Sequence, residues 1–246
     1  MKQLKINNFA PLSYAGAEAM NTLSTNLSFS GENVKKIMIT SCRAAEGKSF
    51  VSMNLMRTLT EHGQRVVLVD ADLRRSMIDL NYEIECPDGE KKGLTHFLAG
   101  KASLEDVLYE TSIPGAWMVP AGREVPNPLS LLTNQHFADL LDALATKVDY
   151  VLVDSPPVGV VIDAAEIARH CDGSIIVVQY NEVRRQELLE VKQQIEQTGC
   201  PILGTVLNQV DYSAYVGRKY YYKSKYGYYN NYYKKDAATV GGKNDL

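Results

Sequence analysis

The chain has 246 residues, enough for one large α/β domain with its last part outside the core. Hydrophobic residues make up 45% of it, and the net charge of −3 gives no general attraction to nucleic acid or anionic lipid, so we expect no nucleic-acid partner. No apolar run is long enough to cross a membrane, and the first residues lack a signal-peptide core. The four cysteines are far apart, which excludes a zinc site or disulfide frame and indicates reduced thiols in a cytoplasmic protein.

Residues 1–33 are predicted to form a polar N-terminal segment that contains one helix. Small and aliphatic side chains recur at helical spacing between Tyr14 and Phe29, and the segment ends in the breaker sequence Gly31-Glu32-Asn33. A helix placed before the first core strand must dock on its own domain or on a partner. Both possibilities remain open at this point.

The stretch Lys36–Leu55, KIMITSCRAAEGKSFVSMNL, predicts a buried strand, a loop of small residues and the start of a helix. Gly47 lets the backbone approach a phosphate, and the helix N-terminus points N–H groups toward it. Lys48 can reach the outer phosphates, and the Ser49 hydroxyl can bind Mg²⁺. Cys42 stands where the full phosphate-loop pattern has glycine, so an ordinary turn with an exposed lysine is the alternative. The predicted nucleotide contacts are Ala44, Ala45, Glu46, Gly47, Lys48, Ser49 and Phe50.

Two more predicted strands end in aspartate. The apolar run Val66–Val69 leads to Asp70 and Asp72, and the run from Tyr150 leads to Asp154, followed by two prolines that end the strand abruptly. Ligands of parallel sheets bind outside the carboxyl ends of the strands. These carboxylates therefore indicate a Mg²⁺–phosphate site beside the loop of Lys48.

Strands and helices alternate along the rest of the chain. This pattern predicts a doubly wound, mostly parallel α/β sheet with helices on both faces. The remaining elements are predicted as a short helix within 76–101, a strand at 117–119, a helix at 134–147, a helix at 162–169, a strand at 174–179, a helix at 184–197 and a strand at 202–207.

The C-terminal residues 212–246 differ from the rest. Ten of the 15 tyrosines lie between Tyr212 and Tyr233, interleaved with lysine and arginine, and aliphatic residues are nearly absent. Such a composition does not pack a core, so we predict a disordered tail. Stacking on single-stranded nucleic acid and self-association are two functions that the composition alone would allow.

These motifs, in this order, resemble the bacterial tyrosine kinases of the polysaccharide-export type in their standalone cytoplasmic form. The resemblance rests on Ala45–Ser49, Val66–Arg74, Val151–Pro157 and the terminal tyrosine cluster, with support from the stretches around Gly93 and Pro120. It implies a kinase domain at 34–211 that uses ATP and Mg²⁺, with the tail as its own substrate. It also implies a transmembrane activator protein that recruits the kinase to the inner face of the membrane, a cognate phosphatase, and a role in capsule or exopolysaccharide synthesis. The implied autophosphorylation sites are Tyr220, Tyr221, Tyr222, Tyr226, Tyr228, Tyr229, Tyr232 and Tyr233.

The resemblance also implies roles for single residues. Lys48 would bind the β- and γ-phosphates, while Ser49, Asp70 and Asp154 would form the metal site, Asp154 through water. Asp70 would activate the acceptor hydroxyl and Asp72 would organise the phosphate site, although these two roles are interchangeable. Arg74 would stabilise developing charge or form a surface ion pair, and Asn208 would contact the base or form a simple turn.

The sequence departs from the family pattern in its N-terminal helix and around the phosphate loop. The family's Glu-x-x-Arg-x-x-Arg motif, which builds a ring of subunits, is here Glu18-x-x-Asn21-x-x-Ser24, so a homo-oligomeric ring is in doubt. Phe50 replaces a second hydroxyl residue. Arg43 stands where related partitioning ATPases have a lysine, and it would contact a nucleotide across a dimer or remain solvated. A partitioning-type ATPase and a catalytically weak regulatory scaffold are the alternative functions.

Overall fold

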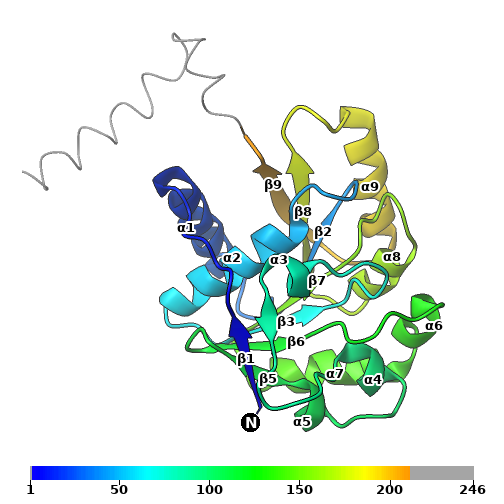
Figure 1. Ribbon diagram of the computed structural model, residues 1–246. Coiled ribbons are helices and arrows are strands. Elements are labelled where there is room, and N and C mark those ends of the chain that lie inside the picture. Colours follow the sequence, from blue (N-terminus) through cyan, green and yellow to red (C-terminus); the bar gives the residue numbers. More distant parts are fainter. Residues whose placement is uncertain (1, 211–246) are drawn as a thin grey trace, which may run out of the picture. The chain divides into compact units, whose positions relative to one another are not determined.

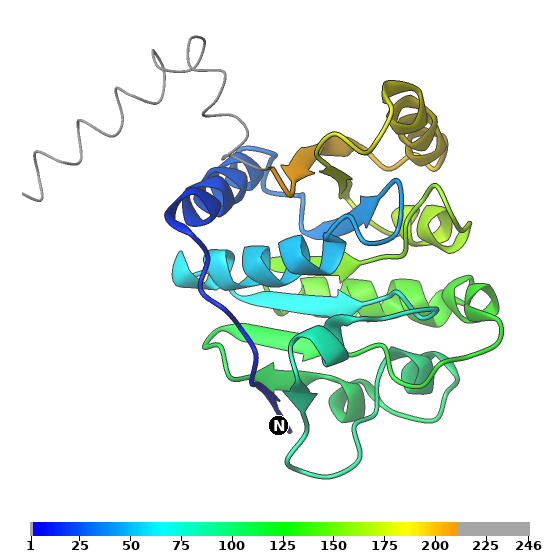
Figure 2. The same cartoon turned by 45° about the horizontal axis from the view of Figure 1, so that its top comes forward.

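The computed structural model describes residues 2–210 and shows an α/β domain with helices on both faces of one sheet (Figures 1 and 2). Contacts within the chain divide it into the units 1–209 and 210–246. The predicted tail, with all eight implied phosphorylation sites, lies outside the described residues. No helix of the described part is long and apolar enough to span a membrane.

The sheet of the described residues has nine strands in the order β4-β1-β5-β6-β3-β7-β2-β8-β9, and its centre is parallel. The pairs β1–β4 and β5–β6 are antiparallel. The predicted mostly parallel, doubly wound class is therefore confirmed. The strands are β1 (Gln3–Ile6), β2 (Lys36–Ser41), β3 (Val66–Asp70), β4 (Ile84–Glu85), β5 (Tyr109–Thr111), β6 (Ala116–Val119), β7 (Tyr150–Asp154), β8 (Gly173–Gln179) and β9 (Ile202–Asn208).

Both faces of the sheet are buried, and alternate residues of each central strand enter different cores. In β3, Val67 and Val69 belong to one core, while Val66 and Leu68 belong to the other. This explains the uninterrupted apolar run, because a strand covered on both sides has no polar face. The helices are α1 (Tyr14–Ser28), α2 (Lys48–Glu61), α3 (Ile78–Asn81), α4 (Leu94–Leu98), α5 (Leu104–Val107), α6 (Pro128–Leu132), α7 (Gln135–Ala145), α8 (Asp163–Ala168) and α9 (Arg185–Gln197).

The N-terminal segment contains a strand that the sequence did not predict. Strand β1 pairs in parallel with β5 and antiparallel with β4, and both partners are short strands. The paired residues lie more than 75 positions apart in the sequence. Gln3–Ile6 alternates polar and apolar residues, but four residues are too few to predict a strand by themselves, and the pairing comes from the partner strands. Residues 1–33 are thus partly a component of the sheet.

Helix α1 docks on its own domain, which is one of the two possibilities open from sequence. Met20 and Leu27 are buried in the same core as α2, and the Ser24 hydroxyl lies 3.0 Å from Nδ1 of His62 at the end of α2. Ser24 is the position where the ring motif has arginine. Here its short side chain completes an internal contact of the domain.

Candidate active site

Three neighbouring strands bring the predicted site residues to one edge of the sheet. Asp70 and Asp154 are direct partners in the register of β3 and β7, and β7 pairs on its other side with β2, which leads into the phosphate loop. The backbone N–H of Ala71 donates to the carbonyl of Asp154 over 2.8 Å. The sequence-based expectation that these segments converge is confirmed.

The phosphate loop between β2 and α2 is held from inside by Glu46. This carboxylate is buried and accepts hydrogen bonds from the backbone N–H of Arg43 at 2.7 Å and of Gln179, at the end of β8, at 3.3 Å. Both Ala45 and Gly47 have positive φ, at 65° and 90°. Glu46, predicted as a nucleotide contact, thus uses its side chain to shape the loop.

Strand β9 supports the same loop from outside. The amide of Asn208 donates from Nδ2 to the Glu46 carbonyl at 2.9 Å, and Gln209 donates from Nε2 to the Ala45 carbonyl at 3.1 Å. A Cβ atom at Gly47 would lie 2.0 Å from Asn208 Nδ2. Asn208, for which the sequence left a contact to the base and a simple turn open, packs against the phosphate loop.

The first turn of α2 joins the loop to Asp154. Lys48 is largely buried, and the Ser49 hydroxyl donates to Asp154 Oδ2 at 2.7 Å. Ser52, one turn further on, donates to Asp154 Oδ1 at 2.9 Å. The sequence did not single out Ser52, although its spacing of three from Ser49 places both hydroxyls on one helix face. Phe50 points elsewhere and is exposed.

Asp70 and Asp154 form a buried carboxylate pair at this edge. Burial and the nearby Asp154 charge hold the pKa of Asp70 well above its usual range. Burial also raises the pKa of Asp154 to about 6, although Lys48 and the two serine hydroxyls oppose the shift. Two buried like charges are costly unless a cation or protons accompany them.

Asp72 and Ser76 complete the loop after β3. The Ser76 hydroxyl donates to Asp70 Oδ2, and the backbone N–H of Asp72 donates to Asp70 Oδ1 at 3.3 Å. Asp72 in turn accepts from the backbone N–H of Arg75 at 3.2 Å. Both carboxylates are buried, but Asp70 is fully buried and Asp72 is 9% exposed, so Asp72 is the less buried of the two. Ser76 had no signal in the sequence beyond its closeness to the motif.

Arg74 and Arg43, two of the arginines near the site, form bidentate ion pairs. Arg74 donates to Asp163, at the start of α8, over 2.5 and 3.0 Å. Arg43 donates to Glu187 of α9 over 2.6 Å from both Nε and Nη2. Arg43 is therefore an exposed side chain, as one of the two sequence-based alternatives expected, but its ion pair with Glu187 holds it within its own domain in this conformation. The ion pair that the sequence left open for Arg74 is present.

The donor set fits a Mg²⁺–nucleotide complex better than a metal held by protein alone. Within residues 2–210 there is no group of three or more His, Cys, Asp or Glu side chains arranged to hold a metal ion. Mg²⁺ typically takes one or two carboxylates and completes its shell with water and substrate phosphates. The Ser49 hydroxyl and the buried carboxylates of Asp70 and Asp154 are ligands of the type that Mg²⁺ takes, and the loop with Gly47 at the start of α2 presents backbone N–H groups for phosphates.

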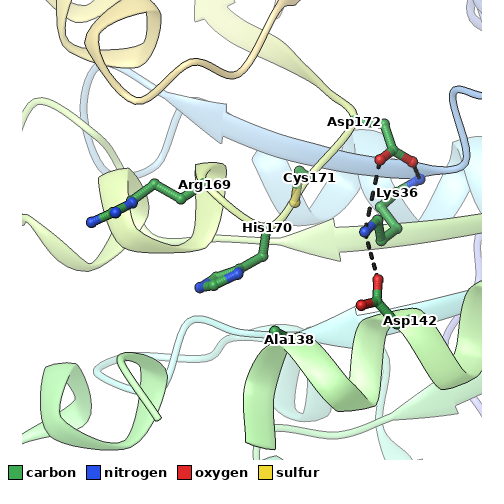
Figure 3. Close-up of a pocket in the computed structure, with 7 residues that line it drawn as sticks. All are labelled: Lys36, Ala138, Asp142, Arg169, His170, Cys171 and Asp172. Carbon is green, nitrogen blue, oxygen red and sulfur yellow. Dashed lines mark hydrogen bonds and ion pairs between the residues drawn. The ribbon is translucent and has the colours of Figure 1, made fainter. Parts of the chain in front are cut away.

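A cavity of about 180 Å³ lies at the opposite edge of the sheet and is not part of this site (Figure 3). Lys36, at the start of β2, contacts Asp142 at 2.7 Å and Asp172 at 3.8 Å there. Asp172 also accepts from the backbone N–H groups of Lys35 and Lys36 at 3.0 and 2.8 Å. These charges already compensate one another.

The fold and this edge define a protein of the P-loop nucleotide-binding class, and comparisons with known proteins agree. Residues 34–200 match the family model described as AAA domain. The chain is 39% identical to the tyrosine-protein kinase CpsD of Streptococcus agalactiae over 219 residues, which cover 89% of this chain and 90% of that protein.

Solved structures give the same result. The kinase domain of the Escherichia coli tyrosine kinase ETK matches with a TM-score of 0.73 and 31% identity, covering 80% of this chain and 78% of that one. The septum site-determining protein MinD of Pyrococcus horikoshii, in complex with Mg-ADP, matches with a TM-score of 0.61 and 26% identity, covering 70% and 69%. The chain belongs to the family of bacterial tyrosine-protein kinases. It is a nucleotide-binding enzyme that phosphorylates tyrosine.

Proposed function

We propose that this kinase uses ATP and Mg²⁺ to phosphorylate tyrosines of its own C-terminal cluster, and that this reaction controls capsule or exopolysaccharide synthesis and export. The observation that carries the proposal is the pair of buried carboxylates, Asp70 and Asp154, beside a lysine and a phosphate-binding loop. The sequence supplies the acceptor, because β9 ends at that loop and the chain continues into the tyrosine cluster.

Phosphoryl transfer needs aligned phosphates, neutralised charge and an oriented nucleophile. The loop N–H groups and Lys48 hold the phosphates, and Ser49 with Asp70 and Asp154 forms the place for the metal. When bound there, Mg²⁺ would supply positive charge that offsets the charge of the phosphates. The tyrosine oxygen attacks the γ-phosphorus, ADP leaves, and the phenolic proton passes to a carboxylate.

Asp72 is the better candidate to accept that proton. It is the less buried of the two, whereas Asp70 is fully buried and accepts hydrogen bonds from Ser76 and from the backbone of Asp72. Of the two interchangeable assignments, we therefore propose Asp72 as the base for the acceptor and Asp70 as a metal-site residue. In Asp72→Asn, transfer to tyrosine should fall about 100-fold while ATP binding changes little, which is within the usual contribution of a general base.

The direct test incubates the purified protein with ATP and Mg²⁺ and maps phosphotyrosine by mass spectrometry. We expect modification within the cluster at Tyr220, Tyr221, Tyr222, Tyr226, Tyr228, Tyr229, Tyr232 and Tyr233. Lys48→Met should abolish it. Tyr82 and Tyr109 are internal controls, because both are buried and should remain unmodified. Phosphate release without phosphotyrosine would instead support a partitioning-type ATPase.

We further propose a transmembrane activator whose cytoplasmic segment recruits the kinase to the membrane, and a phosphatase that reverses its modification. The assay is therefore run with and without that segment, and a regulatory scaffold would yield no product in either case. If the rate of autophosphorylation per enzyme molecule stays constant on dilution, transfer between molecules is excluded.

In this proposal, self-association of the protein does not depend on the ring motif. It should weaken as phosphates accumulate on the tyrosine cluster, because each phosphate adds a charge of about −1.5 to −2. Light scattering before and after reaction measures it, and an unchanged mass would contradict the charge argument.

A further inference from the structure

The ion pair of Arg74 and Asp163 connects two loops that each carry a site carboxylate. Arg74 lies in the loop after β3, which contains Asp72, and Asp163 begins α8 after the loop that starts at Asp154. The guanidinium donates from Nε to Asp163 Oδ2 at 2.5 Å and from Nη2 to Oδ1 at 3.0 Å. Such a bidentate pair fixes direction as well as distance.

The two partners differ in exposure. The Asp163 side chain is 1% exposed, while that of Arg74 is 41% exposed. Asp163 is therefore anchored in the protein and the arginine is the accessible partner. A guanidinium has five N–H donors, of which this pair uses two, so the others can meet an anion from solvent.

The anchor itself is fixed against the phosphate loop. The loop from Asp154 to Asp163 returns past β2, where the backbone N–H of Val158 donates to the Ser41 carbonyl at 3.0 Å. A Cβ atom at Gly159 would lie 2.4 Å from the Cys42 carbonyl oxygen, so this backbone sits directly on the phosphate loop. A movement of the phosphate loop, or of the loop from Asp154 to Asp163, would therefore shift Asp163.

We propose that Asp163 is a positioning residue that holds the Arg74 guanidinium at the active-site edge, where its remaining donors contact the phosphoryl group during transfer. This inference rests on the proposed kinase reaction and adds a residue to it. The same arrangement orients Asp72, because the loop that Arg74 anchors also holds the Asp72 carboxylate through the backbone N–H of Arg75. The pKa of Arg74 is raised, first by the hydrogen bond to Asp163 and then by the charges of Asp163 and Asp72, which agrees with this geometry.

A double-mutant cycle on the full chain tests the proposal by the rate of phosphotyrosine formation. Asp163→Asn should lower kcat about 10- to 100-fold and leave KM for ATP within about twofold, because misplacement of a contact made during transfer affects the chemical step. Arg74→Ala should lower kcat at least as much. The double variant should be no slower than Arg74→Ala alone, because Asp163 acts through the arginine.

Chemical rescue separates positioning from a general structural defect. Low millimolar guanidinium should restore part of the activity of Arg74→Ala, and it should fail to do so once Asp163→Asn is added, because the carboxylate that orients it is gone. Asp163→Glu, which keeps the charge, should lose less than Asp163→Asn. If Asp163→Asn does not fold, the comparison of rescue in Arg74→Ala and in Asp163→Glu/Arg74→Ala still measures the dependence on the anchor.

Asp149→Asn is the matched control. Asp149 forms a bidentate pair with Arg65 over 3.0 and 3.3 Å at the opposite edge of the sheet, and its loss should leave kcat unchanged. Additive losses in the double variant, or full activity of Asp163→Asn, would overturn the inference. An inactive wild-type enzyme would instead contradict the proposed function.

Discussion

The central strands have acidic residues at both ends, and the surroundings of these residues differ between the edge formed by the amino ends of the strands and the edge formed by their carboxyl ends. At the amino edge, Asp149 lies against Arg65, and the hydrogen bonds from that arginine hold the pKa of the carboxyl below its usual range. At the carboxyl edge, burial raises the pKa values of Asp70 and Asp154. Both edges are built from the same strands, so the difference does not arise from the fold.

This contrast indicates where the protein gives up stability for function. Carboxylates paired with arginine stabilise the domain or are neutral, whereas two buried carboxylates in adjacent register oppose folding until a cation joins them. Two glycines of positive φ, one at each edge, also differ in the space around them. Gly47 at the carboxyl edge is crowded by Asn208, and Gly63 at the amino edge has open space around it.

The largest effect should follow from adding one methyl group at Gly47. In Gly47→Ala the new Cβ would lie 2.0 Å from Asn208 Nδ2, in a backbone with φ of +90°. The loop must move away from its phosphate-binding shape, so ATP affinity should fall by about 100-fold or more, a loss typical of a misplaced contact. Isothermal titration with ATP and Mg²⁺ measures it.

The control for this variant is Gly63→Ala, which has a similar φ of +80° and no neighbour within 4 Å. Gly63→Ala should lose only about 1 kcal/mol of stability to backbone strain, and it should bind ATP with unchanged affinity. Equal losses of affinity in both variants would show that strain, not crowding at the phosphate loop, is responsible.

Replacing one acid at each edge should change stability in opposite directions. Asp70→Asn removes a buried charge next to Asp154 and should raise the melting temperature of the metal-free protein at pH 8 by about 5 °C, the effect of ~1–2 kcal/mol in a domain of this size. Asp149→Asn removes a partner of Arg65 and should lower it slightly. Calorimetry in EDTA compares them, and a lower melting temperature for Asp70→Asn would contradict the assigned charge conflict.

The pH dependence of stability should also differ between the edges. The pKa of Asp154 is about 6 in the folded protein and about 3.9 when unfolded, so between these values the folded state holds a proton that the unfolded state has lost. Its contribution to stability is complete below pH 4 and is lost as the pH rises through 6. Asp149, with its lowered pKa, contributes at higher pH and loses that contribution as the pH falls.

Denaturant unfolding in EDTA from pH 4.5 to 8 would reveal the Asp154 contribution as a decline in stability. That decline should shrink in Asp154→Asn and persist in Asp149→Asn. A decline of equal size in all three proteins would assign it to other groups.

The sequence predicted the carboxyl edge well because its signals are local. An apolar run followed by aspartate marks Asp70 and Asp154, and the glycine before Lys48 marks the phosphate loop. The rule that parallel strands present their carboxyl ends together then brings three distant segments to one place. The central strands and most long helices follow from the same periodic patterns.

The partners of these residues were not predictable in this way. Asp163 lies 89 positions from Arg74, and Glu187 lies 144 positions from Arg43. No local pattern identifies which of many acids meets a given arginine, because the pairing depends on how α8 and α9 pack on the sheet. Strand β1 was missed because its alternating pattern covers only four residues and its pairing depends on distant segments.

The smallest effect is expected at the outer support of the phosphate loop. Asn208→Ala removes the hydrogen bond from Nδ2 to the Glu46 carbonyl, whose length is 2.9 Å, and should weaken ATP binding about fivefold, as the loss of ~1 kcal/mol predicts. Gln209→Ala removes the neighbouring bond to Ala45 at an exposed position and should change affinity less. Fluorescence titration with a labelled ATP analogue resolves the two. Unchanged affinity in Asn208→Ala would mean that the Glu46 carboxylate, bound to Arg43 and Gln179, shapes the loop alone, and that β9 contributes nothing to the difference between the edges.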